Sequence, residues 1–147
     1  MKSKLKNLSK VSFPKSKDLG KRLWGQEILL AFIKNKFTFK LLKLKKNRQG
    51  GLQFHRKKNE VGYLLKGKLK LFFSEDGKIL KKKILTRGSV FHFPPRSIHQ
   101  EIALTDCEIL EISTPYFNDR VRVEEYFNLK ANSGLSTTTL NQITKNL

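Results

Sequence analysis

Cysteine, tryptophan and long apolar runs are nearly missing from the sequence, which contains one cysteine, Cys107, and one tryptophan. A single cysteine excludes an internal disulfide and is typical of a reducing compartment, so we expect Cys107 to be a packing residue. The longest strongly apolar run, residues 28–33, is far too short to cross a bilayer. No apolar segment of the kind found in secretory signals follows the basic N-terminus. These absences predict a cytoplasmic protein with no membrane partner.

Acidic residues are also scarce, because the 147 residues include 12 Asp and Glu against 31 Lys and Arg, a formal net charge of +19. A surplus of this size attracts anions such as nucleic acid, acidic membranes or phosphorylated small molecules. A solvated, lysine-rich surface without a dedicated partner explains the charge equally well. The sequence contains no nucleic-acid-reading motif and no basic helix interleaved with aromatic residues, which argues against a nucleic-acid partner.

Short runs of β type occupy the middle of the chain, from residue 28 to residue 113. Turn residues separate these runs, and Asp76-Gly77 between two of them is typical of a β-hairpin. Strands at this spacing predict an all-β sandwich or barrel, and the length suits one domain. We expect a basic arm over residues 1–20, the folded domain over 21–127, and a polar tail over 128–147. The tail should be weakly ordered or form a short terminal helix.

Four side chains of metal-ligand type gather around two turn signals. Gln53 and His55 are two residues apart, so on a strand they point to the same face. Glu60 begins the next strand after a short turn, and His99 follows the rigid Pro94-Pro95 corner. Two imidazoles, one carboxylate and one amide oxygen suit one divalent ion, Zn, Mn, Fe, Ni or Co, with coordination positions left for a substrate. The alternative is that these are unrelated polar residues.

The same residues resemble the two sequence motifs of the cupin superfamily. The first motif reads G-x5-H-x-H-x3-4-E-x6-G, and the second reads G-x5-P-x-G-x2-H-x3-N. The chain departs from these patterns, because Gln53 replaces the first histidine, Arg96 a glycine and Ala103 the asparagine. The remaining histidine, His92, is not a motif position, and we interpret it as structural. The residues that match the patterns are His55, Glu60 and Gly67 in the first motif and Gly88, Pro94 and His99 in the second, with Gln53 at the position of the first histidine.

The glutamine form of the first motif is similar to that of the type II mannose-6-phosphate isomerases, which read L-Q-Y-H-x4-E where this chain has Leu52-Gln53-Phe54-His55 and then Glu60. That family also has an entry segment W-G-x-E, similar to residues 24–27, and an exit segment D-D-I-V-R-L-E-D, similar to residues 118–125. The resemblance covers about residues 21–127. It implies a double-stranded β-helix of the jelly-roll type, whose metal ligands would be Gln53, His55, Glu60 and His99.

The resemblance further implies a metal-dependent aldose–ketose isomerase for a sugar phosphate similar to mannose 6-phosphate. Such a reaction needs a Lewis acid, a base that moves a proton between C1 and C2, and cations that hold the phosphate. Glu101 is the candidate base, because it lies two residues after His99 and alternation directs it to the same interior. A shift in register would instead leave it on the surface. The candidate substrate-binding residues are Lys40, Arg56, Arg96 and Arg122.

Three other functions stay open from the sequence. The same barrel suits another metal-dependent cupin enzyme, such as an epimerase, a lyase or an oxygenase, because one fold hosts many chemistries. It also suits a non-catalytic module that binds a sugar or an anion, and the basic arm suits a nucleic-acid-associated protein. Small cupins often pair through their sheets, so the resemblance is consistent with a homodimer. The partner that it implies is a small anionic substrate, a phosphorylated sugar.

Overall fold

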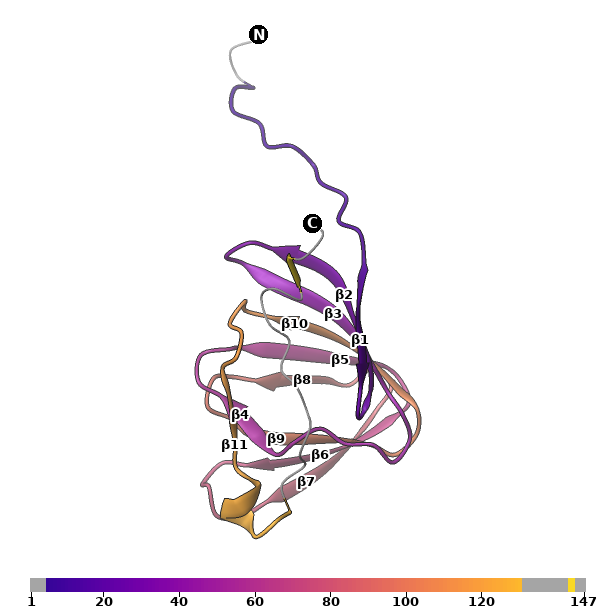
Figure 1. Cartoon of the computed structure of the whole chain (residues 1–147), viewed down its shortest axis with the longest axis vertical. Helices are drawn as coiled ribbons and strands as arrows, with labels where there is room; N and C mark the ends of the chain where they lie inside the picture. The colour runs from indigo at the N-terminus through magenta and orange to yellow at the C-terminus, as the bar shows by residue number, and fades with distance from the viewer. Residues whose placement is uncertain (1–4, 131–142, 145–147) are drawn as a thin grey trace.

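The chain folds into two antiparallel β-sheets that face each other as a barrel, and this computed structural model describes residues 5–130 and 143–144 (Figure 1). The larger sheet has the strand order β1-β2-β3-β10-β5-β8, and the smaller has the order β11-β4-β9-β6-β7. The all-β jelly-roll fold predicted from the sequence is confirmed. The elements are β1 Lys17–Arg22, β2 Gly25–Ile33, β3 Phe37–Leu44, β4 Gln53–His55, β5 Glu60–Lys66, β6 Lys68–Ser74, β7 Lys81–Thr86, β8 Val90–Phe93, β9 Ile98–Ala103, β10 Cys107–Ser113, β11 Arg120–Arg122 and the 3₁₀ helix η1 Glu124–Phe127.

Regular structure begins earlier than the sequence indicated. Strand β1 starts at Lys17, inside the segment expected to be an irregular arm over residues 1–20, because it pairs with β2 along its length. Residues 5–16, which precede it, contain no regular element, and their side chains are exposed. Among the described residues, no helix is long and apolar enough to cross a membrane.

A small apolar cluster joins the C-terminal segment to the first two strands. Ile143 is fully buried and packs with Leu19 of β1 and Leu29 of β2, and Phe32 and Phe117 lie against them. The rest of the predicted polar tail from residue 131 onward lies outside the described residues, apart from Thr144. Ile143 therefore anchors this part of the tail to the barrel.

The predicted hairpin at Asp76-Gly77 joins β6 to β7. The carboxylate of Asp76 accepts hydrogen bonds from the backbone N–H groups of Ile79 at 2.9 Å and Lys78 at 2.8 Å, and these bonds lower its pKa. Gly77 takes a φ of +72°, which side chains rarely adopt. The turn chemistry seen in the sequence therefore produces the turn.

The inward face of β3 shows that the barrel interior has a polar half and an apolar half. Thr38 and Lys40 face inward and are buried, whereas Phe37 at the start of the strand is exposed. Leu42 and Leu44, further along the same face, belong to the hydrophobic core. Alternation thus continues through the strand, but the side chains that point inward change from polar to apolar. The polar half contains the cavity described below.

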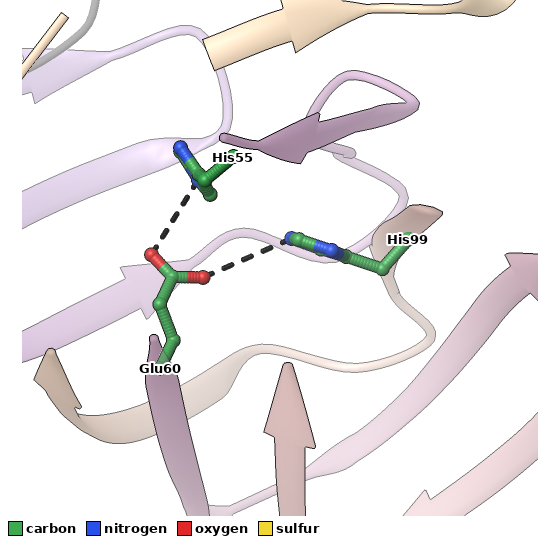
Figure 2. A group of neighbouring side chains, drawn as sticks. All are labelled: His55, Glu60 and His99. Carbon is green, nitrogen blue, oxygen red and sulfur yellow. Dashed lines mark ion pairs between the residues drawn. The ribbon is translucent and has the colours of Figure 1, made fainter. Parts of the chain in front are cut away.

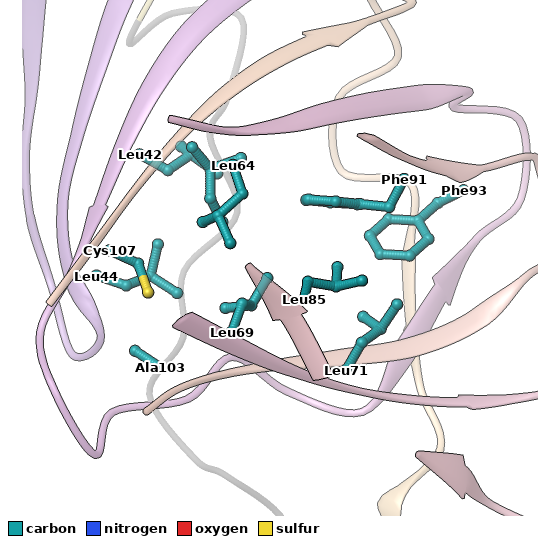
Figure 3. Close-up of a cluster of buried hydrophobic side chains, with 11 residues drawn as sticks. Leu42, Leu44, Leu64, Leu69, Leu71, Leu85, Phe91, Phe93, Ala103 and Cys107 are labelled. Atoms are coloured by element: carbon teal, nitrogen blue, oxygen red, sulfur yellow. The ribbon is translucent and has the colours of Figure 1, made fainter. Parts of the chain in front are cut away.

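Leucine and phenylalanine side chains from both sheets fill the apolar half (Figure 3). Cys107 belongs to this core, and burial raises the pKa of its thiol, which confirms it as a packing residue. Gly62 of β5 leaves room for the ring of Phe91, its partner on the neighbouring strand β8 of the same sheet, because a Cβ there would overlap that ring. The members of the core are Leu42, Leu44, Leu64, Leu69, Leu71, Leu85, Phe91, Phe93, Ala103, Cys107 and Ile109.

Candidate metal centre

Three strands bring the predicted metal ligands together. Gln53 and His55 occupy the two ends of β4, so their side chains point to the same face. The β4–β9 register places His99 directly opposite Gln53. Glu60 is the first residue of β5 and belongs to the other sheet. Residues far apart in the sequence thus converge at one place inside the barrel.

The carboxylate of Glu60 faces both imidazole rings, with one oxygen directed to each (Figure 2). His55 Nε2 is 3.5 Å from Glu60 Oε1, and His99 Nε2 is 3.8 Å from Glu60 Oε2. One ligand atom from each of the three residues lies within 4.8 Å of the others. All three side chains are buried. Atoms at this spacing can contact one small cation at the same time.

The histidines are held in the form that binds metal. His99 Nδ1 lies 2.9 Å from the carbonyl oxygen of Ser97, so the Nδ1–H group donates and the lone pair of Nε2 points toward Glu60. Burial lowers the pKa of His99, and it lowers the pKa of His55 to about 4. Both rings are therefore neutral at pH 7, as metal coordination requires.

Glu60 supplies the negative charge of the site. Burial opposes ionisation, but the charge of Lys58 holds the pKa of Glu60 below its ordinary value. Lys58 Nζ lies 3.4 Å from Glu60 Oε1. The site therefore offers one anionic oxygen ligand beside two neutral nitrogen ligands.

Two buried polar atoms indicate that the site can accept a further binding partner. Gln53 Oε1 and His55 Nδ1 make no hydrogen bond within the part of the chain that the structure describes. Leaving a buried polar atom unsatisfied costs about 1–3 kcal/mol. A divalent cation would satisfy the amide oxygen, because amide oxygens and imidazole nitrogens both bind first-row metals. The residues present therefore fit the divalent metal expected from the sequence.

The ligand side chains line a cavity of about 110 Å³, and Glu101 lines the same cavity. Alternation along β9 from His99 predicted this inward position. Burial, and then the carboxylates of Glu111 and Glu60, raise the pKa of Glu101 to about 8. The cavity thus combines a possible cation site with a separate carboxyl group that exchanges protons near neutral pH.

Glu111 is a second cavity carboxyl, which the sequence analysis did not single out. It lies on β10 between Lys40 of β3 and Gly62 of β5 in the register of the larger sheet. Burial and the charge of Glu60 raise the pKa of Glu111 to about 7. The sequence pattern could have predicted its inward position, because Glu111 follows Ile109 by two residues on an alternating strand and shares its inward face.

Lys40, one of the four cations expected to bind phosphate, lines the cavity but is paired within the protein. Its Nζ donates to Glu27 Oε1 at 2.7 Å, and Arg22 Nε donates to Glu27 Oε2 at 3.0 Å. All three side chains are at most 8 % exposed. Lys40 therefore belongs to a buried ion-pair network.

Arg56, Arg96 and Arg122 are not among the described residues that line the cavity. Arg96 lies over the ring of Phe54, which points to the outer face because its neighbours on β4 point inward. Arg56 is exposed in the turn after β4. Arg122 donates from Nε to Glu124 at 2.8 Å. Arg56 and Arg96 flank ligands in the sequence and Arg122 matches the exit segment of the family, but none of these three side chains lines the cavity.

Two other cations, Lys58 and Arg120, line the cavity in their place. Lys58 lies in the turn between β4 and β5 and contacts Glu60. Arg120 lies opposite His55 in the β4–β11 pair. The resemblance of the exit segment predicts Arg122 and not Arg120, because the family pattern has an arginine at position 122 and an isoleucine at position 120. These two positions could only be found from the fold.

The sequence matches the pattern of a protein family described as Cupin over residues 34–140. The comparison with curated proteins gives no match. The structure is similar to that of KdgF from Halomonas sp., with 19 % identity, a TM-score of 0.54, and coverage of 62 % of this chain and 80 % of KdgF.

Two longer proteins share the fold. The capsular polysaccharide assembling protein CapF from Staphylococcus aureus is 16 % identical, with a TM-score of 0.66 and coverage of 76 % of this chain and 32 % of CapF. Oxalate decarboxylase is 16 % identical, with a TM-score of 0.63 and coverage of 82 % of this chain and 36 % of that enzyme. This chain therefore matches about a third of either protein. At these identities the likeness shows the fold.

Proposed function

The chain belongs to the cupin family, and from this premise we propose that it is a metal-dependent isomerase that interconverts the aldose and ketose forms of a sugar phosphate similar to mannose 6-phosphate. One observation carries the proposal: Glu101, which is not part of the ligand group, lines the same cavity as the ligands. Isomerisation needs a cation at the carbonyl and a separate group that moves a proton. The cavity contains residues suited to hold the cation and a separate carboxyl group suited to move the proton.

Four residues would hold the metal in this proposal. Gln53, His55, Glu60 and His99 suit Zn, Mn, Fe, Ni or Co, and the bound ion would supply a Lewis acid for the substrate carbonyl. The oxygen of Gln53, which is buried and has no hydrogen-bond partner among the described residues, supports its inclusion in the set. We expect His99→Ala to remove most of the bound metal, which elemental analysis of the purified variant measures. Unchanged metal content would overturn the assigned site.

Glu101 is proposed to move the proton between C2 and C1. Its carboxylate takes the proton from C2, and the carboxylic acid so formed returns it to C1, so Glu101 ends in its starting form. A pKa of about 8 suits this role, because both protonation states are accessible near neutral pH. Glu111, whose pKa is raised to about 7, lines the same cavity and is suited to carry a hydroxyl proton.

Two observations support a phosphorylated carbohydrate as the substrate. The glutamine form of the first motif and the entry and exit segments resemble those of sugar-phosphate isomerases, and CapF is described as a capsular polysaccharide assembling protein. Lys58 and Arg120 add positive charge to the cavity wall, where an anionic group would bind. The homodimer and the cytoplasmic location stay predictions.

The proposal is tested by incubating metal-reconstituted protein in D₂O with mannose 6-phosphate and a panel of sugar phosphates, while NMR follows the C2 hydrogens and the products. We expect metal-dependent deuterium uptake and a ketose product. Glu101→Gln should keep the metal and lose both signals. Glu108→Gln is the matched control, because Glu108 lies on the opposite face of β10 from the buried Ile109.

Each other outcome has a defined meaning. Exchange at C2 without a ketose would replace the isomerase by an epimerase. No change in any sugar phosphate, with metal shown to be bound, would overturn sugar-phosphate isomerisation and favour another cupin chemistry or a binding role. Full turnover by Glu101→Gln would remove Glu101 as the acid–base group.

A further inference from the structure

Lys58 is the cation nearest to the ligand group among the described ion pairs. Its Nζ lies 3.4 Å from Glu60 Oε1, and its side chain lines the cavity while remaining 16 % exposed. Lys40, the other lysine of the cavity wall, is 4 % exposed and is paired with Glu27. Lys58 is thus the cavity lysine whose position allows it to meet both a metal ligand and a molecule that enters from solvent.

The backbone of this turn is fixed, so the position of Lys58 is built into the fold. The backbone N–H groups of Lys57 and Lys58 both donate to Oδ2 of Asp119, at 2.7 Å and 2.8 Å. Arg56 donates its N–H to the carbonyl oxygen of Asp119 at 3.1 Å. The next residue, Arg120, lines the cavity. Asp119 therefore ties two cationic positions, Lys58 and Arg120, to the same part of the cavity wall.

Strand register separates Arg120 from Glu101. On β9, Glu101 lies two residues beyond His99 in the direction of Ala103. On β4, Gln53 is the partner of His99, and His55 lies two residues further along the strand. Because β4 and β9 are antiparallel, His55 lies on the side of this pair opposite to Glu101. Arg120 is paired with His55. The ligand group therefore lies between the cationic end of the cavity and Glu101.

A metal on Glu60 changes the electrostatic environment of Lys58. Without it, the ammonium group stabilises the Glu60 carboxylate, and the two form a partly buried ion pair. A divalent ion on the same carboxylate takes over that charge and repels the ammonium group at short range. Lysine carries its charge on a flexible stem, so the group can turn away from Glu60 while its backbone stays fixed. Its charge is then available to another anion.

We propose that Lys58 is the counter-ion of Glu60 in the metal-free protein and becomes the binding group for the phosphate or carboxylate of the substrate once Glu60 holds a metal. This inference rests on the proposed function for the metal at Glu60 and for the anionic substrate. Anion binding should therefore depend on metal, and the anionic end of the substrate should lie away from Glu101. Arg120 contributes the second positive charge at this end of the cavity.

Calorimetric titration with Mn²⁺ alone, and then with inorganic phosphate, tests the proposal on the full chain. Wild-type protein should bind phosphate at one site only when loaded with Mn²⁺. Lys58→Met should weaken that binding at least about tenfold, as expected for a lost charged hydrogen bond, and should tighten Mn²⁺ binding in the absence of phosphate. Lys58→Arg should retain phosphate binding. Lys57→Met is the matched control, because Lys57 lies in the same turn but does not line the cavity.

The outcomes separate this inference from the isomerase proposal. Phosphate binding that is equal with and without Mn²⁺, equal in Lys58→Met, or missing altogether would overturn the role of Lys58. Acetate in place of phosphate shows whether a carboxylate is the preferred anion. Metal-dependent phosphate binding in a protein that leaves every sugar phosphate unchanged would reject the isomerase and retain Lys58. Turnover with an unchanged KM in Lys58→Met would retain the isomerase and reject the role of Lys58.

Discussion

The imidazole ring of His99 lies flat against the ring of Phe93, with centroids 3.7 Å apart and an interplanar angle of 9°. Phe93 is also a member of the hydrophobic core, so the core and the candidate metal centre share a wall. The hydrogen bond from His99 Nδ1 to Ser97 fixes the ring from a second direction. These two contacts hold the Nε2 lone pair toward Glu60 before any ligand arrives.

We therefore expect Phe93→Leu to lower metal affinity about tenfold, because second-layer contacts of a ligating histidine have effects of this size. The free energy of unfolding should also fall by about 1–2 kcal/mol from lost core packing. Phe91→Leu is the control, since Phe91 lies in the same core but is not stacked on His99. Equal metal affinity in the two variants, measured by competition with a chelating dye, would contradict a role for the stacked ring.

Gln53 offers a prediction in which metal binding and stability change in opposite directions. Its Oε1 is buried without a hydrogen-bond partner in the described part of the chain, so Gln53→Met should leave metal-free stability unchanged or raise it by up to about 1 kcal/mol. Metal affinity should fall at least about tenfold. Gln100→Met is the control, because Gln100 donates to the carbonyl of Gly50 at 3.0 Å and should lose stability without losing metal.

Much of this site was readable from the sequence because its geometry is local. Alternation on one short strand places Gln53 and His55 on the same face, and the same rule carries Glu101 inward from His99. The hairpin at Asp76-Gly77 likewise depends on neighbouring residues alone. Such features need no knowledge of which strands become neighbours.

The cations of the cavity depend on tertiary pairing and could not be predicted in the same way. Lys40 was a reasonable candidate until the fold placed Glu27, on the adjacent strand, beside it. Lys58 and Arg120 line the same cavity because Asp119 binds the turn after β4, a contact between residues about sixty positions apart. Strand β1 was missed for a similar reason, since its six residues are largely polar and only the pairing with β2 makes them a strand.

The pH dependence of stability should show that the pKa of Glu101 is raised in the folded protein. Its pKa in the folded, metal-free protein is about 8, against an ordinary value of 4.5, so the folded state holds a proton that the unfolded state releases. The unfolding free energy therefore falls as pH rises through this interval. The lowered pKa of His55, about 4 against 6.5, acts with the opposite sign but only below pH 6.5.

We accordingly expect Glu101→Gln to gain stability relative to the wild type as pH rises from 6.5 to 8, because the glutamine has no proton to lose. The unfolding free energy of the variant should still fall with pH, but less steeply, because the pKa of Glu111 is raised to about 7. Urea denaturation of the metal-free proteins at several pH values measures the difference. Parallel stability curves for the variant and the wild type would show that Glu101 is ionised in the folded protein.

The buried Ile143 predicts that the C-terminal segment contributes to stability. Ile143→Ala should lower the free energy of unfolding by about 2–4 kcal/mol, because it removes a side chain packed with Leu19 and Leu29. Leu129→Ala is the control, since Leu129 is 42 % exposed and should cost less than about 0.5 kcal/mol. Equal midpoints of thermal unfolding for the two variants would show that the segment is not packed against β1 and β2 in solution.

Lys40 distinguishes a structural from a substrate-binding role in the cavity. Its ion pair with Glu27 is buried, and Arg22 also donates to that carboxylate. Lys40→Met should therefore lower the free energy of unfolding by about 2 kcal/mol. This is less than the 3–5 kcal/mol typical of a buried charge left without any partner. Adding Glu27→Gln to Lys40→Met should lower stability further, because the buried guanidinium of Arg22 then loses its carboxylate partner. Urea denaturation of both variants measures this coupling. Unchanged stability of Lys40→Met, together with weaker phosphate binding by the metal-loaded variant, would instead return Lys40 to the substrate-binding role predicted from the sequence.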